Sequence, residues 1–213
     1  LLTRSDHKAR MDRMLYNERS AEALRAAADL GGDQEALAKA VVAVIKREPK
    51  AIAGLDELPD SVREDPLAVF SRIQALRRSE KFDEAVELLL ASPRDPAILV
   101  DPDAWWVERR LLAREIILEE DYRKAYRIVA GHSAQSPAAR AEAEFHAGWI
   151  ALEFLDEPET AKPHFTVIQT VSQRPLSQSR AEYWLGRTAA ALGDEAEATR
   201  QFRLAAAYPT TFY

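Results

Sequence analysis

The sequence contains four histidines, whose imidazoles could bind a metal ion. They stand at His7, His132, His146 and His164. A zinc site needs several ligands at fixed spacing, but the chain has no His-Glu-x-x-His motif, no histidines four residues apart and no cysteine. His146 and His164 are expected on the two helices of one hairpin, where they could face each other. We nevertheless predict neither a metal nor a cofactor, and expect two partly exposed or hydrogen-bonded imidazoles.

Carboxylates, which could act as general acids or bases, occur in close pairs such as Glu119-Glu120, Glu142 with Glu144, and Glu195 with Glu197. Acid–base catalysis needs carboxylates that converge across a cleft, with one in an apolar setting. These pairs instead lie at expected helix starts and hairpin tips, where they complement the helix dipole in solvent. The sequence also lacks a Gly-x-Ser-x-Gly motif and a glycine-rich phosphate loop. We therefore predict no catalytic residue in this chain.

Tryptophans could instead supply flat faces for binding. Trp149 and Trp184 recur with apolar residues at helical core spacing, and we expect both in the core. The adjacent pair Trp105-Trp106 cannot both point inward from one helix, so we expect one of them at a surface or against a neighbouring repeat. This pair provides the first candidates for contact with a ligand.

Arginines make the last part of the chain locally basic. They are Arg174, Arg180, Arg187, Arg200 and Arg203. They form either a solvated helical face balanced by nearby acids or a face that attracts an anionic polymer or a partner domain. Arg180 and Arg187 are the candidate contact residues of this group.

The elements that position these residues are predicted to be helices. The chain has 213 residues, of which 47% are hydrophobic and 30% charged, with a net charge of −6. This composition excludes disorder, the apolar runs are too short for a membrane helix, and the negative balance disfavours nucleic acid as a partner. Stretches rich in Ala, Leu, Glu and Arg alternate with Gly and Pro, without the period-two pattern of strands. The absence of cysteine leaves the compartment open.

Helices are expected over 5–16, 18–30, 33–47, 66–79, 81–91, 103–119, 121–131, 138–155, 159–171, 177–192 and 194–207. The clearest starts are Asp65-Pro66, Asp101-Pro102 and Ser136-Pro137, each an N-cap acceptor followed by proline at the first helical position. Segment 92–102 holds three prolines and is a candidate kink or linker between an N-terminal helical part, 1–91, and a run of hairpins, 103–213.

A repeat organises the predicted hairpins. An alanine is followed four residues later by a large apolar residue in Ala85/Leu89, Ala125/Val129, Ala161/Phe165 and Ala198/Phe202. The alanines are 40, 36 and 37 residues apart, and a small residue stands upstream of the last three, at Ala113, Gly148 and Gly186. Small residues let paired helices approach closely, and the large residue fills the groove. We therefore predict an all-α, TPR-like α-superhelix, an α-solenoid of antiparallel helical pairs with a concave face.

Both ends of the chain resemble one enzyme family. Tyr183-Trp184-Leu185-Gly186-Arg187, Leu192-Gly193-Asp194 and the final phrase from Ala205 to Tyr213 closely resemble the end of the α-superhelical region of soluble lytic murein transglycosylases. The opening residues Asp6-His7, Arg10, Asp12-Arg13 and Leu15-Tyr16 are similar to the start of that superhelix.

The resemblance implies a periplasmic parent enzyme that cleaves the β-1,4 bond between N-acetylmuramic acid and N-acetylglucosamine, leaving a 1,6-anhydro end. In the family the catalytic glutamate lies in a lysozyme-like domain that follows the Tyr-Pro-Thr-Thr-Phe-Tyr phrase. No residue here matches its motif, so this chain is expected to be inactive, with its signal peptide and catalytic domain outside the sequence. The superhelix is expected to hold or guide glycan strands and to support the catalytic domain.

Two other functions stay open. A TPR-type scaffold would bind a peptide or a partner protein in its concave groove, although the single asparagine, Asn17, disfavours a peptide clamp. A purely architectural domain would bind only the catalytic domain, and Tyr208, Phe212 and Tyr213 would then form the docking surface.

Overall fold

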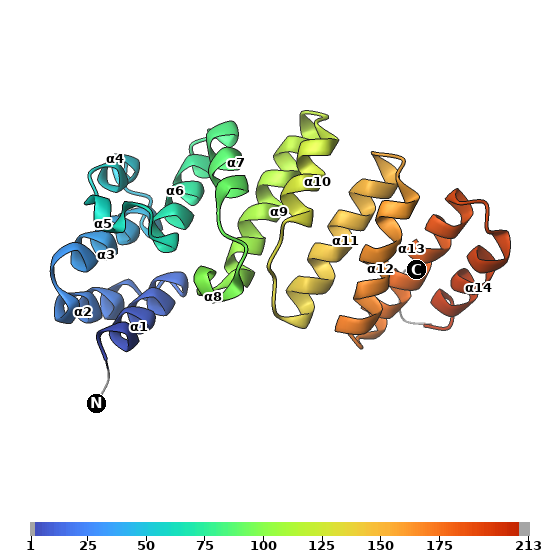
Figure 1. The fold of residues 1–213 in the computed structure, drawn as a ribbon, viewed down its shortest axis with the longest axis horizontal. Helices are drawn as coiled ribbons and strands as arrows, with labels where there is room; N and C mark the ends of the chain where they lie inside the picture. The colour runs from blue at the N-terminus through green and yellow to red at the C-terminus, as the bar shows by residue number, and fades with distance from the viewer. Residues whose placement is uncertain (1–2, 209–213) are drawn as a thin grey trace. The chain divides into compact units, whose positions relative to one another are not determined.

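The computed structural model describes residues 3–208, and these residues form an all-α solenoid of paired helices without a strand (Figure 1). The predicted fold class is thereby confirmed. The helices are α1 (Arg4–Tyr16), α2 (Ser20–Leu30), α3 (Gly32–Ile45), α4 (Ala51–Asp56), α5 (Asp60–Arg63), α6 (Pro66–Arg78), α7 (Phe82–Ala91), α8 (Pro96–Leu99), α9 (Pro102–Leu118), α10 (Tyr122–Ala130), α11 (Pro137–Glu153), α12 (Pro158–Val171), α13 (Pro175–Ala191) and α14 (Glu195–Ala205).

The three predicted helix starts are confirmed by their caps. The side chains of Asp65 and Asp101 accept hydrogen bonds from the backbone N–H groups of Leu67 and Ala104, both at 3.0 Å. Ser136 accepts from the N–H of Ala139 at 3.2 Å. The short helices α4, α5 and α8 were not predicted, because four to six residues are too few to show helical periodicity.

Two compact units make up the chain, Leu1–Glu108 and Arg109–Tyr213. In the first unit α1 packs on α2, α2 on α3, and α3 on both α4 and α6, while α6 pairs with α7. Met11, Leu37 and Leu55 are fully buried at the centre of its core. The predicted linker segment 92–102 lies within this unit and contains α8. No helix within residues 3–208 is both long and apolar enough to cross a membrane.

The second unit stacks its helices in chain order, each packed on the next from α10 to α14 (Figure 1). Glycines on the first helix of a pair receive phenylalanine rings from the second. A Cβ added to Gly148 would lie 2.7 Å from the Phe165 ring, and one added to Gly186 would lie 2.6 Å from the Phe202 ring. These contacts confirm the physical reason for the small/large repeat: the helices of a pair touch where a side chain is missing.

Candidate functional site

A groove with a volume of about 830 Å³ lies between α9 and α11 in the second unit. It separates the first helices of two neighbouring hairpins. Helix α9 lines it with Arg110, Leu111, Arg114, Glu115, Ile117 and Leu118, and α11 with Glu142, Phe145, His146 and Trp149. The groove therefore combines apolar, aromatic and charged side chains within reach of one ligand.

Helical periodicity places the α11 residues of the groove on one face. Glu142, Phe145, His146 and Trp149 follow the i, i+3, i+4, i+7 spacing. Phe145 and Trp149 are only half-buried, and their rings are nearly parallel, with centroids 6.5 Å apart and planes inclined by 12°. Phe154 and Trp149 pack edge to face, with ring centroids 4.9 Å apart and 85° between their planes. Two adjacent aromatic rings are thus held in fixed orientation at the wall of an open groove.

Charged groups flank the aromatic wall. Arg110 of α9 donates to Glu142 of α11 across 2.5 Å, and this ion pair joins the two sides of the groove. The guanidinium of Arg180, from α13, lies over the Phe145 ring at 4.7 Å from its centroid. Nδ1 of His146 donates to the backbone oxygen of Glu142 at 2.8 Å. Burial lowers the pKa of His146; the hydrogen bond to Glu142 and its charge oppose this, while the charges of Arg110 and Arg180 act in the same direction as burial.

One of the residues that line the groove is an exposed leucine. Leu118, the last residue of α9, is 79% exposed and lines the groove together with the half-buried Ile117. A large aliphatic side chain open to water beside two half-buried aromatic rings favours an apolar contact with a ligand. Single exposed hydrophobic residues are common, so the continuity with Phe145 and Trp149 is what makes Leu118 informative.

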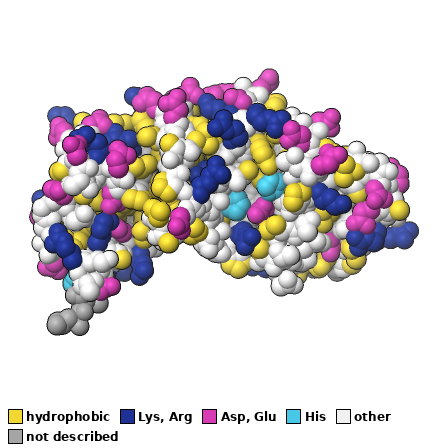
Figure 2. All heavy atoms as spheres, in the orientation of Figure 1, with side chains coloured by type: hydrophobic (Ala, Val, Ile, Leu, Met, Phe, Trp, Pro, Cys, Tyr) yellow, Lys and Arg dark blue, Asp and Glu magenta, His cyan; other side chains and the backbone are white. Residues whose placement is uncertain are grey.

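A second polar cluster in this unit joins Glu144 to two histidines. Nδ1 of His164 donates to Glu144 Oε2 at 2.7 Å, while Nε2 of His132 lies 3.4 Å from Glu144 Oε1. Nε2 of His164 and the hydroxyl of Tyr126 are 3.0 Å apart. Burial alone would raise the pKa of Glu144, but the hydrogen bonds and charges of His132 and His164 outweigh it and lower the pKa to about 2. Figure 2 shows histidine and acidic atoms together over the region of α10 to α12.

This His/Glu cluster does not have the geometry of a metal centre. Its carboxylate is hydrogen-bonded to the imidazole that would have to ligate beside it, and Nδ1 of His132 accepts from the N–H of Ala134 at 3.3 Å. Across residues 3–208, no group of three or more His, Asp or Glu side chains is arranged to hold a metal ion. His146 and His164, which the sequence allowed to face each other, are hydrogen-bonded to different partners, Glu142 and Glu144. The cluster ties the turn after α10 to α11 and α12.

The tryptophan pair does not provide a surface contact. Trp105 and Trp106 are each 1% exposed, so of the two positions predicted for one of them, a surface or a neighbouring repeat, the surface is excluded. The Trp105 indole N–H donates to the hydroxyl of Tyr16 at 3.1 Å, and its ring packs against Phe70. Adjacent residues are about 100° apart around a helix, so both can be buried where neighbours cover more than half of its circumference.

The other predicted contact residues have different positions. Arg180 lies against the aromatic wall of the groove, whereas Arg187 is bound to Glu153 at 2.9 Å and lies over the Trp184 ring. Tyr208 is half-buried after α14, and its N–H donates to Ala205. Phe212 and Tyr213 lie outside the described residues.

Sequence reasoning missed the groove because it assigned Trp149 to the core. Trp184 is indeed buried, but Trp149 is half-buried and lines the groove. The signal was present in the residues around it: the helical face that carries Phe145 and Trp149 also carries Glu142 and His146. Polar residues on the same face as two aromatic residues indicate a boundary with solvent rather than a core.

Comparisons of the chain with protein-family models, with curated proteins and with solved structures found no match.

Proposed function

We propose that this chain is the non-catalytic superhelical domain of a peptidoglycan lytic transglycosylase and that the groove between α9 and α11 holds a glycan strand. The resemblance of both chain ends to soluble lytic murein transglycosylases supports the family. The observation that carries the glycan proposal is the pair of oriented, half-buried rings, Phe145 and Trp149, in an open groove beside charged groups.

The chemistry of a glycan suits this arrangement. A pyranose ring has an apolar face of C–H groups that packs on a flat aromatic side chain, and its rim carries hydroxyl and amide groups that need hydrogen-bond partners. In the groove, the rings of Phe145 and Trp149 would take the apolar faces of successive sugars. The exposed Arg114 and the half-buried Glu115 of α9 would bind their polar rims.

The cleavage reaction of the proposed parent belongs to a separate catalytic domain, in the periplasm. The groove itself supports binding only. Two carboxylates line it: Glu142 is held by Arg110, and Glu115 is the one proposed to bind sugar rims. The imidazole of His146 is engaged with a backbone oxygen, so Glu142 and His146 are not positioned as the paired acid and base that glycoside cleavage requires.

Co-sedimentation with insoluble peptidoglycan tests the proposal. We expect the chain to pellet with peptidoglycan and to release no anhydro-muropeptide. Arg114→Ala and Trp149→Ala should each weaken binding, Trp149→Ala by about tenfold for the loss of a stacked ring. Arg127→Ala is the matched control, because Arg127 is exposed on α10 and does not line the groove.

Any other result of this assay would contradict the proposal in its own way. Failure of the wild-type chain to pellet would refute the glycan proposal and favour a TPR-type scaffold that binds a peptide or a partner protein, or an architectural domain that docks only its catalytic domain. Release of anhydro-muropeptide would show that this chain contains an active site. Equal loss of binding in Arg127→Ala would show that the contact is made by general charge and not by the groove.

A further inference from the structure

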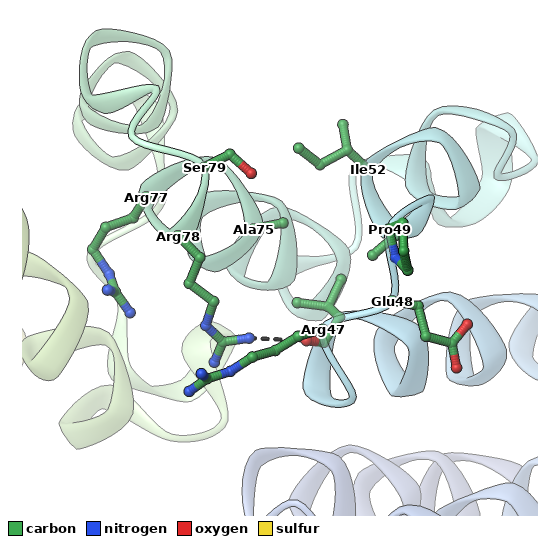
Figure 3. A pocket seen from close by; sticks show the side chains of 10 residues that line it. Arg47, Glu48, Pro49, Ile52, Ala75, Arg77, Arg78 and Ser79 are labelled. Carbon is green, nitrogen blue, oxygen red and sulfur yellow. Dashed lines mark hydrogen bonds between the residues drawn. The ribbon is translucent and has the colours of Figure 1, made fainter.

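A pocket with a volume of about 560 Å³ lies in the first unit, between the end of α3, the start of α4 and the end of α6 (Figure 3). Its apolar part is formed by small and medium side chains: Val44, Ala51 and Ala75 are buried and Ile52 is half-buried. Its polar part is formed largely by arginines. The pocket belongs entirely to the first unit and is separate from the proposed glycan groove.

Two guanidinium groups come together beside this pocket. Figure 3 shows the side chains of Arg47 and Arg78 extending toward the same point, while the carboxylate of Glu48 points away from them. Arg78 is fixed because its Nη1 donates to the backbone oxygen of Val44 at 2.9 Å. Arg47 follows α3 with a φ of +55°, a left-handed conformation that is unusual for a residue with a side chain.

Glu108 and Glu18 act on Arg78 through their charge without forming an ion pair with it. The carboxylate of Glu108 accepts hydrogen bonds from Arg77 at 2.6 Å and from Gln74 at 3.1 Å. Within residues 3–208, neither Arg47 nor Arg78 forms an ion pair. Burial lowers the pKa of Arg78, and the neighbouring charges of Arg77 and Arg47 act in the same direction, opposed by Glu108 and Glu18. Two like charges held together cost free energy that a bound anion would recover.

We propose that this pocket binds the C-terminal carboxylate of a peptide that ends in a small apolar residue. The carboxylate would accept hydrogen bonds from Arg47 and Arg78, and planar guanidinium groups match the geometry of a carboxylate. The terminal side chain would pack on Val44, Ile52 and Ala75. The apolar wall is what selects a peptide end over a simple inorganic anion, which would gain nothing from it.

Calorimetric titration of the whole chain with N-acetyl-alanyl-alanine tests this assignment. We expect saturable binding of the free acid and at least tenfold weaker binding of its C-terminal amide, because the amide removes the charge that Arg47 and Arg78 recognise. Inorganic phosphate, added alone, should bind at least tenfold more weakly than the peptide acid.

Arg47→Gly is the diagnostic variant, because it removes one guanidinium and leaves a residue that adopts the positive φ without strain. It should fold and bind the peptide acid at least tenfold more weakly. Glu120→Gly is the matched control: Glu120 also has a positive φ, of 62°, but lies in the second unit, so binding should be unchanged. Equal affinity for acid and amide, equal affinity for phosphate, or unchanged binding in a folded Arg47→Gly would each overturn the proposal.

Discussion

Replacing Gly148 with alanine should destabilise the second unit, although alanine is the better helix former. An alanine gains about 1 kcal/mol over glycine in a helix interior. The new Cβ would, however, lie 2.7 Å from the Phe165 ring, where ordinary contacts between carbon atoms are about 3.5–4.0 Å. The ring must therefore move by about 1 Å. Phe165 is fully buried and is stacked on Trp184 at 5.7 Å, so it has little room to move.

The size of the effect follows from these two opposing contributions. Overpacking a well-packed core costs about 1–3 kcal/mol, which exceeds the helix-propensity gain. After the helix-propensity gain of about 1 kcal/mol is subtracted, we expect Gly148→Ala to lower the free energy of unfolding by up to about 2 kcal/mol, measured by urea denaturation followed by circular dichroism. Gly186→Ala should cost less, because the Phe202 ring that it meets at 2.6 Å is only half-buried and can shift toward solvent.

Two further variants test whether the Phe165 ring is what destabilises Gly148→Ala. Gly54 is also helical but has no atom within 4 Å of an added Cβ, so Gly54→Ala should stabilise the protein by up to about 1 kcal/mol. Phe165→Leu should partly rescue Gly148→Ala, with a coupling energy of about 1 kcal/mol in a double-mutant cycle. If Gly148→Ala stabilises the protein as Gly54→Ala does, or if the two sites do not couple, the small/large packing account is wrong.

Three other predictions follow from single residues. The pKa of Glu144 is lowered from 4.5 to about 2 in the folded state, so the stabilisation by its carboxylate is complete above pH 4.5 and is lost as the pH falls toward 2. In Glu144→Gln, the free energy of unfolding should therefore fall less between pH 4.5 and pH 2 than in the wild-type chain, by on the order of 3 kcal/mol. Glu120 has a φ of 62°, so Glu120→Gly should raise the free energy of unfolding by about 0.5–1 kcal/mol while Glu120→Ala leaves it nearly unchanged, as denaturant titration would show. Burial raises the pKa of Glu182, whose Oε2 is buried without a hydrogen-bond partner. Glu182→Gln should therefore raise the thermal unfolding midpoint at neutral pH, because it removes a buried charge. An unchanged or lower midpoint would contradict this.

The fold could be predicted from local features of the sequence. The N-caps Asp65, Asp101 and Ser136 bind N–H groups only two or three residues further along the chain, so a short stretch of sequence is enough to predict them. The Gly148–Phe165 contact joins residues on successive helices and recurs in the next pair, which is why a repeat reveals it. Regular packing between neighbours in the chain leaves a periodic signal.

The candidate site could not be predicted in the same way. Trp149 and Trp184 have similar core spacing, yet only Trp184 is covered, because coverage depends on which face of each helix its neighbours leave open. The same limit left a surface and a neighbouring repeat as alternatives for one of Trp105 and Trp106, which are both buried. The ion pair of Arg110 with Glu142 joins residues 32 positions apart and has no local signature.

A fluorescence titration with soluble glycan strands tests the central proposal most directly. Trp149 is the tryptophan that lines the groove, whereas Trp105, Trp106 and Trp184 are buried. We predict a saturable change in tryptophan emission in the wild-type chain and its loss in Trp149→Phe, in which a ring remains to bind but the reporter is gone. No change in the wild-type chain, or the same change in Trp149→Phe, would contradict a glycan held against this groove.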